Sequence, residues 1–165
     1  MEAVIFDLDD TLVDTSMLRA HREARRWPEA KAGVVNTKMF DGVGEMLAEL
    51  TARGVHVAIV TTSPTPYARV VLEHHRIAYD VMVAYHDAKP KPAPDPCLKA
   101  MQLLKVTATG TIGVGDALKD AVSYRAAGIR AYAAGWSPAT VFDALWDGRF
   151  MVPADLLALP SVPKR

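Results

Sequence analysis

The feature that most constrains this fold is the alternation of short apolar runs with segments of helical periodicity. We expect strands at about residues 3–6, 55–60, 81–85, 111–114 and 129–133. Strands that alternate with helices form βαβ units, whose strands run parallel and whose helices cover both faces of the sheet. The pattern therefore predicts an α/β fold with a doubly wound parallel sheet.

Helical segments separate these runs. Between residues 41 and 53, apolar side chains recur at the spacing of one helical face: Val43, Met46, Leu47 and Leu50. Gly54 follows as the natural stop of that helix. Further helices are expected to begin at 64–66, with Thr62 and Ser63 as capping residues, at 95–96, near 119 and at 137–138.

Two acids and a hydroxyl follow the first apolar run, at Asp7, Asp9 and Thr11. Two carboxylates two residues apart point the same way if the chain stays extended, so both would face one cleft and share a hard cation such as Mg²⁺. One of them could instead attack phosphorus while the other transfers a proton. The alternative is a strand-end turn in which the Asp side chains accept hydrogen bonds from free backbone N–H groups.

Three later segments carry the residue types that phosphoryl chemistry needs. Thr61 follows an apolar run, where a hydroxyl and free N–H groups can hold phosphate oxygens. Lys89 and Lys91 lie among prolines that stiffen the chain around an ammonium group. Asp116 and Asp120 follow a strand and begin a helix. Ligands of open α/β sheets bind at the carboxyl ends of the strands, so we expect these groups to meet there.

In this order the four segments resemble the motifs of the haloacid dehalogenase-like (HAD) hydrolase superfamily. The family pattern is Asp-x-Asp-x-Thr, a strand-end Thr or Ser, a Lys, and Gly-Asp-x-x-x-Asp. The resemblance covers about residues 3 to 135. Its Lys-Pro-x-Pro-Asp-Pro and Val-Gly-Asp details are similar to the phosphoglycolate phosphatase and phosphoglucomutase branch. It implies a Rossmann-like HAD core.

The resemblance also implies catalytic roles. Asp7 would be the nucleophile, and Asp9 the general acid and base. Thr61 would bind phosphate, and Lys91 would neutralise charge. Lys89 remains an alternative to Lys91, although the segment that starts at Lys91 matches the family spacing better.

A metal site is implied as well. Mg²⁺ would lie between Asp7, the backbone carbonyl of Asp9 and Asp116, with Asp120 supporting the site. The resemblance thus predicts a Mg²⁺-dependent phosphomonoesterase in which Asp7 forms an aspartyl-phosphate, and the second acid favours phosphate esters over dehalogenation. Two alternatives stay open: a phosphosugar mutase with the same nucleophile, and a non-catalytic domain like a response-regulator receiver. A mutase must exclude water between half-reactions, and receivers carry the phosphorylated Asp on a later strand.

The segment of about residues 14–40, here called the cap segment, is short compared with the helical caps of related phosphatases. A reduced cap leaves a cleft open unless another subunit or partner covers it, which favours a bulky or partner-presented phosphorylated substrate. Arg22, Arg25 and Arg26 lie at helical spacing and could form one positive face toward an anionic substrate, or a solvated surface.

Composition narrows the remaining classes. The chain has 165 residues, 50% of them hydrophobic and 23% charged, as in one globular domain over residues 1–165. Nineteen basic and nineteen acidic residues give no net charge, so nucleic-acid binding is not indicated. No apolar run approaches the roughly 20 residues of a membrane span. The single cysteine, Cys97, and the absence of an apolar signal region predict a cytoplasmic protein.

Overall fold

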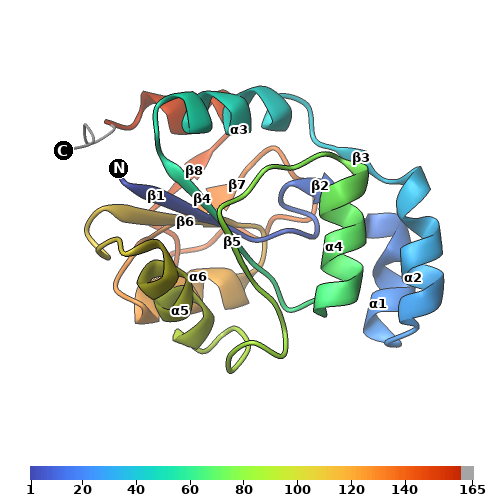
Figure 1. The fold of residues 1–165 in the computed structure, drawn as a ribbon. Helices are drawn as coiled ribbons and strands as arrows, with labels where there is room; N and C mark the ends of the chain where they lie inside the picture. The colour runs from blue at the N-terminus through green and yellow to red at the C-terminus, as the bar shows by residue number, and fades with distance from the viewer. Residues whose placement is uncertain (161–165) are drawn as a thin grey trace.

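A six-stranded parallel sheet forms the centre of the computed structural model, which describes residues 1–160 (Figure 1). The strand order is β5-β4-β1-β6-β7-β8, and every neighbouring pair is parallel. The strands are β1 (Ala3–Phe6), β4 (His56–Val60), β5 (Val81–Val83), β6 (Thr111–Gly115), β7 (Arg130–Ala134) and β8 (Gly148–Phe150). The doubly wound α/β prediction is confirmed, and the five expected strands lie within two residues of their predicted bounds.

Helices cover both faces of this sheet, as Figure 1 shows for α3 on one side and α5 and α6 on the other. The long helices are α3 (Val43–Ala52), α4 (Thr65–His74), α5 (Asp95–Leu104) and α6 (Leu118–Ala126). A 3₁₀ helix, η3 (Pro153–Ala158), packs beside α3. Residues 161–165 lie outside the described part of the chain.

The two faces arise from the alternation of side chains along each strand. In β1, Val4 and Phe6 join the apolar cluster that contains residues of α3 and α4, while Ile5 joins the cluster under α5 and α6. In β4, Val57 and Ile59 belong to the first cluster and Ala58 and Val60 to the second. These inner strands are apolar on both faces, which explains their continuous apolar sequences.

The prediction of a helix that begins at 137–138 is wrong. Residues 135–147 form turns and irregular loop, and β8 follows and extends the sheet. The polar groups of this segment form hydrogen bonds that a helix would not make. The Thr140 hydroxyl donates to Ala134 O at 2.6 Å, and the Val141 N–H donates to Asp116 O at 3.0 Å. Tertiary hydrogen bonds therefore outweigh the N-terminal helix signal of Ser-Pro.

The cap segment is joined to the core by a narrow antiparallel ribbon of β2 (Val13–Asp14) and β3 (Lys38–Met39). Between these strands lie η1 (Ser16–Leu18), α1 (Arg19–Glu23), α2 (Trp27–Gly33) and η2 (Val34–Asn36). Helix α2 packs against α4, with the rings of Trp27 and Tyr67 5.5 Å apart. The cap segment therefore stands beside α4 at the edge of the molecule (Figure 1).

Within residues 1–160, none of the helices has the length and apolar character required to cross a membrane.

Candidate active site

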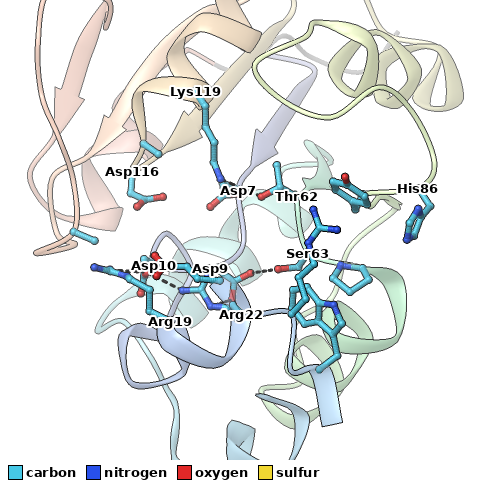
Figure 2. Close-up of a pocket in the computed structure, with 17 residues that line it drawn as sticks. Asp7, Asp9, Asp10, Arg19, Arg22, Thr62, Ser63, His86, Asp116 and Lys119 are labelled. Carbon is cyan, nitrogen blue, oxygen red and sulfur yellow. Dashed lines mark hydrogen bonds and ion pairs between the residues drawn. The ribbon is translucent and has the colours of Figure 1, made fainter. Parts of the chain in front are cut away.

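Three adjacent strands deliver the predicted site residues to one edge of the sheet. Because β1 lies between β4 and β6, Asp7, Thr61 and Asp116 follow neighbouring strand ends. Figure 2 shows Asp7 and Asp116 on one side of a pocket, with Asp9 on the opposite side. The prediction that these residues lie together at the carboxyl ends of the strands is therefore confirmed.

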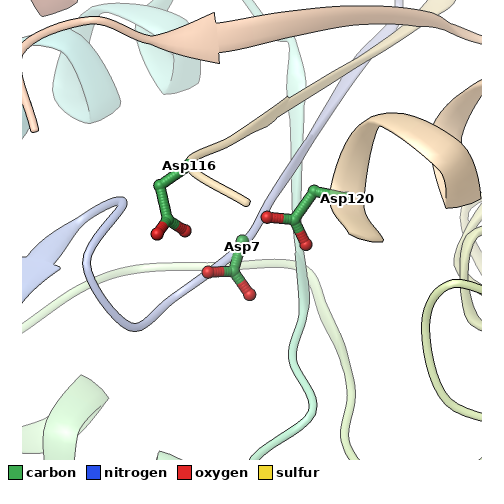
Figure 3. Close-up of side chains that lie close together, drawn as sticks. All are labelled: Asp7, Asp116 and Asp120. Carbon is green, nitrogen blue, oxygen red and sulfur yellow. The ribbon is translucent and has the colours of Figure 1, made fainter. Parts of the chain in front are cut away.

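Asp7, Asp116 and Asp120 form a compact group of carboxylates (Figure 3). One oxygen of each lies within 4.8 Å of the others. Asp120 comes from the first turn of α6 and accepts a 3.0 Å hydrogen bond from the Ala117 N–H. Gly115 permits this close approach, since a Cβ there would lie 2.6 Å from Asp120 Oδ2.

Negative charge is concentrated in this carboxylate group. Burial, and then the charges of Asp7 and Asp120, raise the pKa of Asp116 to about 8. Burial also raises the pKa of Asp120, against the opposing effect of Lys91. The Thr11 hydroxyl lies 3.3 Å from Asp7 Oδ2 and 3.1 Å from Asp116 Oδ1, and one proton cannot satisfy both. Oxygen ligands that repel one another are the donor set that fits Mg²⁺.

Lys91 lies beneath the carboxylates and is fully buried. Its Nζ is 2.6 Å from Asp7 Oδ1 and donates to Val60 O at 2.8 Å. It also lies 2.6 Å from Asp120 Oδ1 and forms an ion pair with that carboxylate. Burial alone would lower the pKa of Lys91, but Asp120 and Asp7 outweigh it and raise that pKa, keeping the ammonium charged. Lys89 is exposed.

The carboxylate of Asp9 does not join this group. Its Oδ1 accepts hydrogen bonds from the Tyr67 hydroxyl at 2.7 Å and the Thr15 hydroxyl at 2.8 Å. Its Oδ2 accepts one from the Ser63 hydroxyl at 2.7 Å, and Arg22 Nε lies 3.6 Å from Oδ1. The strand ends at Phe6, so the extended geometry that would align the two acids is not maintained.

Asp10, which motif reasoning passed over, connects the core to the cap segment. Its backbone is left-handed, with φ of 63°, a conformation that short polar side chains tolerate better than most. Asp10 Oδ2 accepts hydrogen bonds from Arg19 at 3.0 Å and Arg22 at 3.1 Å. The Thr15 N–H donates to Oδ1 at 3.2 Å. These bonds hold α1 over the site.

A cavity of about 510 Å³ separates the cap segment from the strand ends. Its lining includes the acids Asp7, Asp9, Asp10, Glu23 and Asp116, the cations Arg19, Arg22, Arg25 and Lys119, and the rings of Trp27, Tyr85 and His86. Arg25 has φ of 54° and lies beyond α1, which ends at Glu23, so the arginines do not form the single helical face considered above. Arg22 and Arg25 nevertheless both face the cavity.

Thr61 and Lys91 are buried and do not contribute to the described cavity lining, whereas Thr62 and Lys119 do. Lys119 Nζ donates a 3.0 Å hydrogen bond to Thr62 Oγ1. Thr61 Oγ1 accepts a bond from the Ser63 N–H at 3.0 Å. The expectation that Thr62 and Ser63 cap α4 is wrong, because no side chain caps that helix and both hydroxyls bind other partners.

Sequence reasoning missed several residues of the site, chiefly Ser63, Tyr67 and Lys119. Ser63 lies two residues after Thr61, and Lys119 lies within the Gly-Asp-x-x-x-Asp motif. Both positions belong to the recognised segments, but the motif pattern does not predict a role at the cavity for either side chain. Tyr67 lies one turn into α4, and no local pattern indicates its contact with Asp9.

The fold and this site define a class of protein. The haloacid dehalogenase-like hydrolase family matches residues 19–134, more than half of the chain. The chain therefore belongs to the haloacid dehalogenase-like hydrolase family, as its motifs predicted.

Curated relatives are similar in sequence to parts of this chain. The chain is 39% identical over 104 residues to a protein of Caldanaerobacter subterraneus assigned as the pyrophosphatase PpaX, covering 61% of this chain and 47% of that protein. It is 33% identical over 95 residues to the phosphoglycolate phosphatase of Escherichia coli K12, covering 56% and 38%. The matches thus span about half or less of these relatives' lengths.

Among solved structures, CbbY of Rhodobacter sphaeroides in complex with phosphate has a TM-score of 0.81. The two chains are 20% identical, and the alignment covers 94% of this chain and 96% of CbbY. At this identity the likeness shows the shared fold.

Proposed function

We propose that this protein is a Mg²⁺-dependent phosphomonoesterase that forms an aspartyl-phosphate on Asp7. The observation that carries the proposal is the position of Asp7 in the cavity lining, in contact with a buried ammonium and beside two further carboxylates. Family membership and phosphatase relatives support the same reaction class.

The carboxylates of Asp7, Asp116 and Asp120 would hold the Mg²⁺ ion, with the backbone carbonyl of Asp9 as predicted from the motif. The raised pKa of Asp116 supports a cation here, because added positive charge would relieve the repulsion that causes the shift. When bound, the ion supplies positive charge that offsets the charge of the phosphate.

The first step is in-line attack by a carboxylate oxygen of Asp7 on phosphorus. The bond between phosphorus and the ester oxygen breaks, and that oxygen takes a proton from Asp9. Lys91 fixes the attacking carboxylate through its 2.6 Å contact. Asp9 then accepts a proton from water, which attacks phosphorus, and the bond from phosphorus to Asp7 breaks to release phosphate.

Hydrogen bonds fix the carboxylate of Asp9, the proposed acid and base, at the cavity wall. Three hydroxyls and the Arg22 guanidinium surround its carboxylate at the cavity wall. Burial, and then the neighbouring charge of Asp9, raise the pKa of Tyr67 above its usual range, so Tyr67 stays a hydrogen-bond donor. Asp9 must turn from this position toward the leaving oxygen to deliver its proton.

The cavity favours a substrate larger than a minimal phosphate ester. A space of about 510 Å³ lies within the usual range of ligand sites, and the short helices of the cap segment line one side of it. We propose a phosphorylated substrate whose leaving group contacts the arginines of α1 and the aromatic side chains.

Phosphate release from a panel of small and bulky phosphate esters, with Mg²⁺ and with chelator, tests this proposal. We expect release with Mg²⁺ that chelator abolishes. Asp7→Asn should reduce turnover by at least about 10³-fold while far-UV circular dichroism and the thermal midpoint show a folded protein. Wild-type activity in Asp7→Asn would refute the nucleophile assignment. Phosphate exchange with a sugar bisphosphate, without release, would instead support the mutase alternative.

A further inference from the structure

Oxygens of the protein surround the ammonium group of the buried lysine. Oxygens of Asp7, Val60 and Asp120 lie within 2.8 Å of Lys91 Nζ, and an ammonium group has three N–H donors. The Lys91 side chain is 0% exposed. Further positive charge at the substrate phosphate would come from residues that line the cavity.

Four cations line the cavity, and they differ in their partners. Arg19 and Arg22 are paired with Asp10. Arg25 follows the end of α1, on the cap side of the cavity. Lys119 forms no ion pair within residues 1–160, and its hydrogen bond goes to a neutral hydroxyl, that of Thr62. Its charge is thus available to an anion.

The topology places Lys119 and Thr62 on either side of Asp7. Thr62 follows β4, Lys119 lies in the first turn of α6 after β6, and β1 runs between these two strands. Figure 2 shows the Lys119 side chain extending from its helix toward Asp7 and Thr62. A phosphate attacked by Asp7 would therefore lie beside both residues.

The sum of charges around Asp7 also favours a phosphate bound beside Lys119. Three carboxylates and the Lys91 ammonium sum to −3 + 1 = −2, counting the group in its fully ionised form. One divalent cation would balance that sum and leave nothing to offset a dianionic phosphate. Lys119 provides a further positive charge on the cavity side.

We propose that Lys119, together with the Thr62 hydroxyl, binds non-bridging oxygens of the phosphate that Asp7 attacks. Lys91 then holds the nucleophile through its 2.6 Å contact with Asp7. This inference rests on the proposed phosphatase function and assigns its phosphate contacts to two residues whose identity the family motifs leave open.

Lys119→Met tests the assignment. We expect kcat/KM to fall about 10- to 100-fold, chiefly through KM, and the inhibition constant of inorganic phosphate to rise by a similar factor. Lys119→Arg should recover part of both losses, and Thr62→Val should give a smaller loss of about 3- to 10-fold. The matched control is Lys105→Met, an exposed lysine at the end of α5, remote from the cavity.

Phosphate binding measured calorimetrically in an Asp7→Asn background provides a second readout without turnover. There, adding Lys119→Met should weaken the binding of inorganic phosphate at least about tenfold, with an unchanged thermal midpoint. Unchanged KM, inhibition constant and phosphate affinity in an active enzyme would overturn the Lys119 assignment alone. Wild-type protein that neither releases nor binds phosphate would overturn both this assignment and the proposed function.

Discussion

The Tyr67 hydroxyl donates a 2.7 Å hydrogen bond to Asp9 Oδ1, and so links the first full turn of α4 to the second acid of the Asp-x-Asp motif. The bond is buried, and it shares Oδ1 with the Thr15 hydroxyl. An element of the core and a residue at the entry of the cap segment thus fix the same carboxylate.

Tyr67→Phe removes this donor without changing the packing of the ring. A buried hydrogen bond to a charged group contributes roughly 1.5–3 kcal/mol, so we expect a stability loss of that order in urea unfolding. We also expect kcat to fall about tenfold, because Asp9 is less firmly positioned. Tyr79→Phe, at an exposed ring, serves as the control. Wild-type kcat in Tyr67→Phe would show that this bond does not support catalysis.

Replacing the buried ammonium should affect both folding and turnover. Lys91→Met leaves Asp7 and Asp120 without their cation, and breaking a buried ion pair typically costs about 3–5 kcal/mol. We expect a loss of this size in chemical denaturation and no detectable phosphate release. Lys89→Met changes an exposed residue of the same loop and should be close to wild type. The reverse ranking would assign the functional role to Lys89.

Metal binding should stabilise the folded chain. A ligand at about 100 times its Kd adds roughly 2.7 kcal/mol, so we expect Mg²⁺ to raise the thermal midpoint and chelator to reverse the rise. Asp116→Asn should remove most of the effect, whereas Asp41→Asn, at an exposed acid outside the site, should keep it. An equal Mg²⁺ response in both variants would locate the ion elsewhere.

The buried thiol provides a test by pH. Burial raises the pKa of Cys97 to about 11, against the weaker opposing effect of its contact with Ser123. An unfolded thiol has a pKa of about 8.5, so any stability from this group is present below that pH and lost as the pH rises toward 11. Alkylation at pH 8 should be slow in the folded protein and rapid in urea. Rapid labelling of the folded chain would mean that Cys97 is accessible.

Local sequence signals account for much of the fold, because each inner strand is apolar on both faces. Strand β8 was not predicted because Gly148–Phe150 has no apolar run, and its pairing with β7 depends on the irregular connection formed by residues 135–147. The opposite error occurred at residues 137–138, where a local helix signal met stronger tertiary hydrogen bonds.

The site likewise has one part that the sequence predicts and one part that it does not. Strand ends and motif spacing place Asp7, Asp116 and Asp120 together, because the sheet brings those positions to one edge. The direction of the Asp9 carboxylate depends on donors from three separate segments, and the contact between Lys119 and Thr62 joins residues 57 positions apart. Such contacts form only in the folded structure, and no periodic pattern in the sequence predicts them.

The ribbon of β2 and β3 has a further consequence. With two residues in each strand, it attaches the cap segment through a neck that leaves the six-stranded sheet undisturbed. Insertions or deletions between residues 18 and 37 that keep Thr15 and Arg22 would alter the roof of the cavity, while Asp7, Asp116 and Asp120 keep their positions at its floor. Substrate choice would then evolve largely apart from the nucleophile and its neighbouring carboxylates, and exchanging the rest of that segment offers a direct way to engineer selectivity.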